Sequence, residues 1–223
     1  MAYALEFTDV LPYLPDFATG ALTTLRLSLL AMVIGIITAI PLAWLRLHGS
    51  AVVRAVIRVY IEAIRNTPLL VQIYLVYFGL PSLGLRLSPT IAALAAMTLN
   101  VSAYATEIVR SGIQSIDKGQ VEAGLALGLR RLRVFRLIVL RPALRAVYPA
   151  LTSQFIILML FSSLVSAISA NDLSSVGAHV QSLTFRSFEV YLIVGLIYLF
   201  LSSLLSWVFS LIERRFLAYP TSA

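Results

Sequence analysis

Amide, hydroxyl and phenol side chains interrupt long apolar stretches of this sequence, and they are its strongest candidates for chemistry. Asn100 and Tyr104 lie four residues apart, so they share one face if the segment is helical. A polar side chain in hydrocarbon is costly unless it pairs with another group or faces water. Hydrogen bonding to a polar solute along a pathway is therefore the chemistry that such residues could provide. The candidate pathway residues are Gln72, Asn100, Tyr104, Ser162, Ser163 and Ser166.

The two amides also have a structural interpretation, because a buried amide needs several hydrogen-bond partners of its own. Gln72 and Asn100 could line a pathway or could satisfy neighbouring groups inside the bundle. Glu107 is expected to be structural, because Arg110 follows three residues later and can pair with it on a helix.

The sequence lacks the residue clusters that catalysis or metal binding requires. Cysteine is absent, and the two histidines, His48 and His179, are far apart. A phosphate-binding P-loop needs a lysine directly after a glycine, whereas the only lysine, Lys118, follows Asp117. We therefore expect a non-catalytic chain without metal or cofactor.

Composition indicates a membrane protein. Of the 223 residues, 60% are hydrophobic and 12% are charged, whereas soluble domains are about 25% charged. Four segments reach the roughly 20 residues that a helix needs to cross a bilayer, and they are 22–45, 89–109, 143–168 and 190–212. A fifth segment, 67–80, becomes long enough if its helix starts within 52–66 and bends at Pro68. We expect an all-α integral membrane protein of about five transmembrane helices that forms one domain, 1–223.

Basic residues divide unequally between the two sides that five crossings define. The chain has 17 Lys and Arg residues. Only Arg26, Arg86 and Arg186 fall on the side that holds the N-terminus, which leaves 14 on the other side. Because cytoplasmic loops carry an excess of Lys and Arg, this distribution predicts an N-terminus outside the cell and a cytoplasmic C-terminus.

The longest cytoplasmic loop, about 111–141, carries the densest charge of the chain. Its sequence predicts a short helix over 120–127 with Glu122 near the start, where the helix dipole favours an acid. Gly128 suits a helix stop, and 129–140 can form a second helix with Leu132, Phe135 and Val139 on one apolar stripe. The loop is thus expected to be a helix–turn–helix outside the membrane that presents an apolar ridge to an intracellular partner.

This loop resembles the signature loop of the membrane subunits of bacterial ATP-binding-cassette (ABC) importers. The resemblance lies in Glu122-Ala123-Gly124, in Gly128 and in the Ile-Val-Leu sequence at 138–140. In that family the loop docks into a cleft on the ATPase subunit, and we call it the coupling loop. The resemblance implies ATPase coupling by Glu122, Ala123, Gly124, Gly128, Arg131 and Phe135.

Two positions depart from the family pattern. Gly124 stands where alanine is usual, and Arg141 stands where a proline is usual, with Pro142 one place later. We expect the turn into the fourth span to shift slightly while the loop is retained.

Other segments are similar to the polar amino acid branch of these importers, namely 65–72 (RNTPLLVQ), 100–120, 184–186 and 188–191. The resemblance implies a permease subunit in the bacterial inner membrane that moves polar amino acids by alternating access. It implies three partners: a cytoplasmic ATPase, a periplasmic or extracellular amino-acid-binding protein, and a second permease copy or homologue. Leu160 stands where many relatives carry a polar residue, so the transported amino acid stays open, as does the choice between homodimer and heterodimer.

Asp172, Arg186 and Glu189 are candidate contacts for the delivery protein, with solvated loop charges as the alternative interpretation. Two other functions also remain open. A stand-alone ion-coupled transporter would need a charged relay in mid-membrane, and the nearest candidate is Glu107. A non-transporting scaffold would use the basic loop to recruit a partner or anionic lipid.

Overall fold

The computed structural model describes residues 5–217, except for the side chains of residues 131, 132, 140, 141, 216 and 217. All regular elements in these residues are helical. The α-helices are α1 (Leu14–His48), α2 (Ala51–Arg65), α3 (Leu69–Tyr74), α4 (Pro89–Gln114), α5 (Lys118–Ala126), α6 (Arg131–Val134), α7 (Arg141–Phe161), α8 (Leu173–Thr184) and α9 (Ser187–Ile212).

Four helical segments in the described part of the chain are long and apolar enough to cross a membrane. They are Leu11–His48, Pro89–Gln114, Pro142–Ile168 and Ser187–Arg215, and each contains one of the four long spans expected from the sequence. A shorter apolar helix covers Leu69–Leu83. The additional crossing predicted from residues 67–80, which is second in chain order, depends on this short segment together with the end of α2.

The break between α2 and α3 occurs at the expected proline. α2 ends at Arg65, and Pro68 is the N-cap of α3 with an extended ψ of 140°. Proline disfavours helical backbone in the residue before it and lacks the N–H that a continuous helix would use. A π-helical turn, Leu75–Gly79, then extends α3 toward Gly84, which adopts a left-handed φ of 85°.

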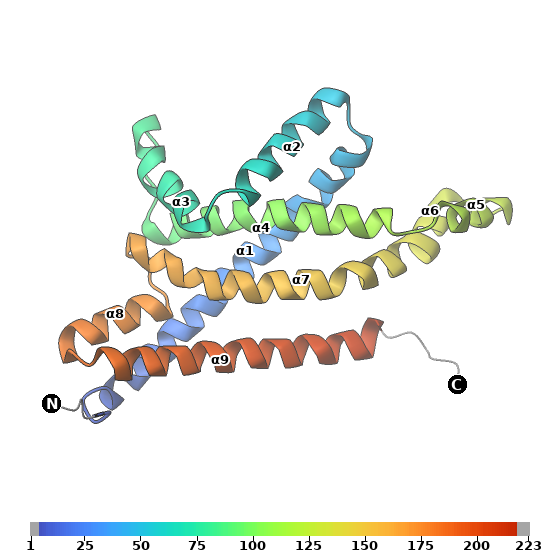
Figure 1. Cartoon of the computed structure of the whole chain (residues 1–223). Coiled ribbons are helices and arrows are strands. Elements are labelled where there is room, and N and C mark those ends of the chain that lie inside the picture. Colours follow the sequence, from blue (N-terminus) through green and yellow to red (C-terminus); the bar gives the residue numbers. More distant parts are fainter. Residues whose placement is uncertain (1–4, 218–223) are drawn as a thin grey trace.

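Small residues allow the long helices to pack closely. α4 buries Ala92, Ala93 and Ala96, and α1 meets it at Gly35, where an added Cβ would lie 2.3 Å from Val101 Cγ1. Such close backbone approach is the usual way in which helices associate when lipid removes most of the hydrophobic drive. In Figure 1, α4, α7 and α9 run side by side and α1 crosses them obliquely.

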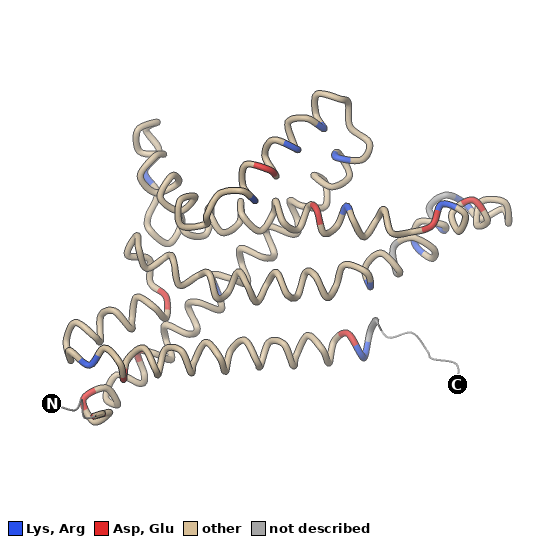
Figure 2. The backbone as a smooth tube through the Cα atoms, in the orientation of Figure 1, with Lys and Arg blue, Asp and Glu red and all other residues tan. Residues whose placement is uncertain are grey.

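The two ends of the molecule differ in shape. At one end the N-terminal segment packs beside α8 and the start of α9. At the other end α5 and α6 project beyond both the end of α9 and the α1–α2 connection (Figure 1). Basic positions occur along α2, at α5–α6 and at the end of α9, whereas the long helices between the ends are mostly uncharged (Figure 2).

The candidate coupling loop and polar clusters

Asp117, and not Glu122, begins the first helix of the coupling loop. α4 continues to Gln114, three residues further than the predicted loop boundary. Asp117 then caps α5, because its Oδ1 accepts a hydrogen bond of 2.7 Å from the backbone N–H of Gly119. Glu122 lies in the middle of α5 and is exposed. The expectation that it supports the helix start is therefore wrong, and its side chain points to solvent.

Gly124 allows the two helices of the loop to touch. Its position is buried, and an added Cβ would lie 2.5 Å from Ile138 Cδ1 and 3.2 Å from Val134 Cγ2. Val134, on α6, is 2% exposed, and Ile138 belongs to the π-helical turn Phe135–Leu140 that joins α6 to α7. α5 thus packs against the segment that leads directly into the next long helix.

The predicted apolar stripe of Leu132, Phe135 and Val139 is not the face that packs inside the loop. Val134 and Ile138 contact Gly124 instead, and Phe135 is 49% exposed. A stripe that faces a partner is expected to be exposed, as Phe135 is, and the side chain of Leu132 lies outside the described residues. The prediction of one regular helix over 129–140 is wrong, because the backbone over Phe135–Leu140 widens into a π-helical turn.

Gly128 ends α5 as predicted, through a Schellman motif. Its φ is +77°, its N–H donates to Leu125 O at 3.0 Å, and the N–H of Leu129 donates to Gly124 O at 3.2 Å. No atom lies within 4 Å of a Cβ built at Gly128. The requirement for glycine here is therefore conformational, whereas at Gly124 it is spatial.

An apolar surface remains open on the coupling loop. Leu125, Leu127 and Phe135 are 41%, 82% and 49% exposed. Glu122 and Ala123 are also exposed and lie on the same short helix. The side chain of Arg131 lies outside the described residues. Of the predicted coupling residues, Glu122, Ala123 and Phe135 are thus available to a partner, whereas Gly124 and Gly128 shape the loop.

Gln72 and Asn100 bond to each other across the break in the second helical segment. The Gln72 side-chain N–H group donates to Ile64 O at 2.7 Å and to Thr67 O and Thr67 Oγ1 at 3.0 Å. Asn100 Nδ2 donates to Gln72 Oε1 at 3.0 Å. Both amides are 6% exposed. They fasten α2, α3 and α4 together, as the structural interpretation expects, and a role in the pathway stays a prediction.

Tyr104 lies in a cavity of about 520 Å³ between α2, α4 and α7. The Arg65 guanidinium stacks over its ring, 5.2 Å from the centroid. On the same cavity, Glu107 forms the expected pair with Arg110, at 2.7 Å. Glu107 Oε1 also lies 3.9 Å from Arg46 Nε, so this carboxylate links α4 to the end of α1.

The three serines bond to their own backbone. Ser162, Ser163 and Ser166 each donate to the carbonyl three residues earlier, at 2.7–2.8 Å. They lie in a 3₁₀ segment, Ser162–Ile168, that follows α7. Of the three, only Ser166 lines a cavity of about 820 Å³, together with Asp16, Thr19, Thr23 and His179 among others. The predicted pathway residues therefore lie in three separate places in one chain.

Two acidic residues proposed as contacts for a delivery protein are buried. Asp172 is 0% exposed and caps α8, where its side chain accepts from the Ser175 N–H at 2.8 Å. Burial raises the pKa of the Asp172 carboxyl, and the hydrogen bonds from Ser175 and Ser174 partly offset this rise. Glu189 is also 0% exposed and accepts the Glu6 N–H at 3.0 Å. These carboxylates hold the fold together and cannot serve as surface contacts.

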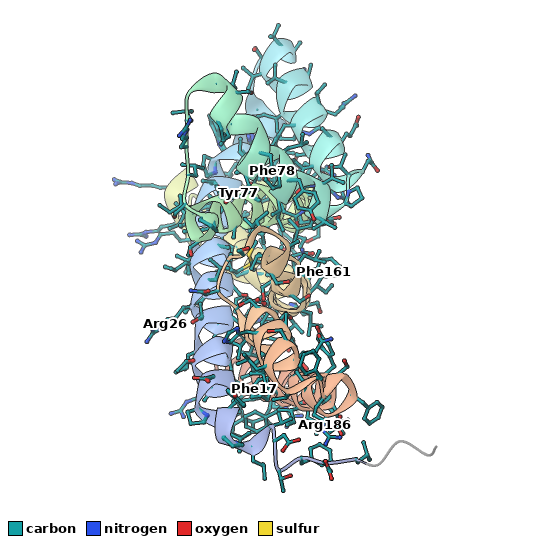
Figure 3. All side chains as sticks on the ribbon, turned by 90° about the vertical axis from the view of Figure 1, so that its left-hand side faces the viewer. Phe17, Arg26, Tyr77, Phe78, Phe161 and Arg186 are labelled. Carbon is teal, nitrogen blue, oxygen red and sulfur yellow. The ribbon has the colours of Figure 1, made fainter. Side chains whose placement is uncertain are left out.

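Arg186 joins the N-terminal segment to the α8–α9 turn. It pairs with Glu6 and with Asp9, the latter at 3.1 Å. Figure 3 shows Arg186 at this end of the molecule, below Phe17 in that view. Phe17 is fully buried. The sequence did not indicate these ion pairs, because the residues that form them are more than 170 positions apart.

The described residues contain no group of three or more His, Cys, Asp or Glu side chains that could hold a metal ion. Their polar clusters instead offer hydrogen bonds and ion pairs. The arrangement can join helices to one another and expose one projecting helical arm to a partner.

Comparison with known proteins covers almost the whole chain. Residues 14–218 match the family described as "Binding-protein-dependent transport system inner membrane component". The chain is 35% identical to the glutamine transport system permease protein GlnP of Escherichia coli (strain K12), over 94% of this chain and 97% of that protein. It is 32% identical to the arginine transport system permease protein ArtQ of Bacillus subtilis (strain 168), over 95% and 97%.

Two solved structures are similar to this chain in fold. The fold is similar to a chain in a crystal structure of an amino acid ABC transporter with histidines, with a TM-score of 0.89, 37% identity, and coverage of 96% of this chain and all of that one. A chain of the inward-facing MetNI methionine ABC transporter is similar in fold, with a TM-score of 0.73 at 19% identity and coverage of 91% and 97%.

Proposed function

The chain belongs to the family of binding-protein-dependent transport system inner membrane components, and we propose that it is the permease subunit of an ABC importer for polar amino acids. The observation that carries this proposal is the match along nearly the full chain to permeases named for glutamine and arginine transport. The open helix–turn–helix of the coupling loop supports it, because this surface is suited to a separate motor subunit.

The proposed topology has five crossings, with the N-terminus outside and the C-terminus in the cytoplasm. The second crossing begins within α2 and continues through the segment Leu69–Leu83 after a bend at Pro68. Two features support this arrangement. The Gln72 side chain bonds across the bend to the last turn of α2, which makes the two pieces one unit. With this crossing in place, the strongly basic segments all face the cytoplasm.

The coupling loop transmits motion as a rigid lever. α5 contacts Val134 and Ile138 through Gly124, and the π-helical turn Phe135–Leu140 continues directly into α7. A displacement of α5 is therefore passed to a membrane-spanning helix without an intervening flexible linker. An ATPase can drive transport in this way only if it binds α5 differently in its two nucleotide states.

Three partners complete the proposed transporter. A cytoplasmic ATPase binds the exposed face of α5 and α6, which includes Leu127 and Phe135. An amino-acid-binding protein delivers the solute to the opposite end. A second permease copy or homologue supplies the other half of the pathway, with the Arg65–Tyr104 cavity as its candidate inner portion. The residue roles in this pathway are part of the proposal.

Reconstitution tests the function directly. The permease is placed in proteoliposomes with its ATPase and binding protein, and uptake of labelled glutamine, arginine and histidine is measured with ATP inside or outside. We expect uptake only when ATP is on the ATPase side and the binding protein is present. Uptake that an ion gradient drives without the ATPase would favour a secondary transporter. No uptake, combined with no solute-stimulated ATP hydrolysis, would favour the scaffold.

A further inference from the structure

A basic cavity of about 500 Å³ lies in the elbow between α1 and α2, apart from the coupling loop. Three arginines from two successive helices line it, and the rest of its lining is small or apolar. The lining residues are Arg46, Ala51, Arg54, Ala55, Arg58 and Val59. None of them is acidic, so the cavity concentrates positive charge with no neutralising group in its wall.

The arginines of the elbow are incompletely paired within the described structure. Arg46 lies 3.9 Å from Glu107, a distance at the limit of an ion pair, and its buried Nε has no hydrogen-bond partner. Arg54 and Arg58 are exposed, and no ion pair involves either of them among the described residues. Since they are four residues apart, their side chains lie on one face of α2. Glu62 follows Arg58 by four residues on this face but does not line the cavity, so the part of the face at the cavity favours an anion.

An exposed apolar surface adjoins the basic one. Val52, Val56 and Val59 of α2 are 72%, 63% and 66% exposed, whereas Ile57 and Ile61 on another face pack into the bundle. Val59 also lines the basic cavity. α2 therefore places a cationic site and an exposed apolar strip side by side, an arrangement that fits a ligand with an anionic head and a hydrocarbon tail.

The position of the elbow distinguishes a lipid from a soluble ligand. α1 is apolar along a segment long enough to cross the membrane and ends at the elbow. The helices of the coupling loop project beyond the elbow (Figure 1), and basic positions occur at this level on α2 and at the end of α9 (Figure 2). With the topology of the proposed function, on which this inference rests, the elbow lies at the headgroups of the cytoplasmic leaflet.

We propose that the α1–α2 elbow binds an anionic phospholipid, with its phosphate on Arg54 and Arg58 and an acyl chain along Val59. Arginine suits this role because its planar fork matches phosphate oxygens, and basic pockets on the cytoplasmic side of membrane proteins hold anionic headgroups. The site does not depend on which solute is transported. A bound lipid would fix the elbow, and with it the start of α2.

The test measures phospholipid retained by the detergent-purified complex of permease and ATPase, using native mass spectrometry. The complex is first stripped of lipid and then titrated with phosphatidylglycerol or phosphatidylcholine. The elbow variant is Arg54→Gln/Arg58→Gln. Arg214→Gln/Arg215→Gln is the matched control, because it removes the same charge from exposed residues at the end of α9. Thermal melting of both variants confirms that they fold.

We expect the wild type and the control to bind phosphatidylglycerol in preference to phosphatidylcholine, and the elbow variant to bind it roughly tenfold more weakly. Arg54→Lys/Arg58→Lys should restore part of this binding, because charge is kept and the fork geometry is lost. Equal losses in elbow and control variants would mean general surface attraction and would overturn the site. So would displacement of the lipid by inorganic phosphate alone, which would indicate a soluble anion. Loss of the ATPase from the elbow variant with unchanged lipid would assign the surface to a protein contact.

Discussion

The Gln72–Asn100 cluster and the coupling loop differ in how far their side chains are buried and bonded within the chain. In the cluster, both amides are 6% exposed, and Gln72 bonds to two backbone carbonyls, Thr67 Oγ1 and Asn100. In the coupling loop, Leu127 and Phe135 are 82% and 49% exposed. One region is satisfied within the chain, and the other is incomplete without a partner.

This difference separates structural roles from functional ones. A group that is already fully bonded has little free capacity for a solute, whereas an exposed apolar helix face carries a cost in water unless it is covered. We therefore expect mutations in the coupling loop to act on transport with little effect on stability. Mutations in the amide cluster should act on stability first.

The largest effect is expected from Glu122→Lys. The side chain is exposed at the middle of α5, so charge reversal should leave folding and membrane insertion intact while blocking the ATPase contact. Uptake in cells should fall to background, with unchanged permease in the membrane by immunoblot. Glu213→Lys, an equal reversal at an exposed site beyond α9, serves as the control and should transport normally. Normal uptake by the Glu122 variant would remove this residue from the coupling surface.

Gly128→Asp should also abolish uptake, for a conformational reason. The φ of +77° is strained for any residue with a side chain, although no atom obstructs a Cβ there. Asparagine sometimes takes the place of glycine at this position after a helix end and, unlike aspartate, adds no charge, so Gly128→Asn should retain part of the uptake. The comparison is made by ATP-dependent uptake in proteoliposomes at matched permease amounts. Equal loss in both variants would indicate a steric contact at this position in the assembled transporter, and not the turn itself.

Gln72→Leu should destabilise the isolated permease without any partner present. It leaves two partly buried backbone carbonyls and the buried Asn100 side chain without their partner, which should lower the free energy of unfolding by about 2 kcal/mol and the melting temperature by about 4–8 °C. Asn100→Leu should cost less, and the double variant less than the sum of the two. Thermal melting in detergent measures all three, with Gln154→Leu as the control. A changed KM for uptake at unchanged melting temperature would instead place Gln72 in the solute pathway.

The smallest effect is expected from Gly124→Ala. The new Cβ would lie 2.5 Å from Ile138 Cδ1, the flexible end of a side chain that can move. Uptake should fall only about fivefold, as expected for about 1 kcal/mol of strain in the lever, which is the low end of the cost of overpacking. Ile138→Val removes the obstructing atom, so the double variant should recover. If Ile138→Val fails to rescue Gly124→Ala, the contact between α5 and the turn before α7 does not matter for coupling.

Local sequence signals predicted those parts of the fold that local backbone chemistry controls. Pro68 marks the break between α2 and α3, and Gly128 ends α5 with a left-handed turn. The pairing of Glu107 with Arg110 followed from helical spacing. Each of these features depends on residues a few positions apart, which a single sequence displays directly.

Features that depend on distant segments could not be predicted. Gln72 and Asn100 are 28 positions apart in the sequence, and Arg186 and Asp9 are 177 positions apart. Asp172 and Glu189 looked like loop charges, yet tertiary packing buries both completely. The π-helical turn Phe135–Leu140 interrupts the helix predicted over 129–140, so the packing of Val134 and Ile138 against Gly124 could not be predicted from a regular helical period.

The central claim is that the coupling loop faces the cytoplasm, and thiol labelling tests it most directly. The chain has no native cysteine, so Leu127→Cys on the loop and Phe185→Cys on the α8–α9 turn, both at positions more than 80% exposed, each provide a single target. A membrane-impermeant maleimide is applied to spheroplasts and to inverted vesicles. We predict that the Leu127→Cys variant reacts only in inverted vesicles and the Phe185→Cys variant only in spheroplasts. Labelling of the Leu127→Cys variant from outside intact spheroplasts would contradict the account.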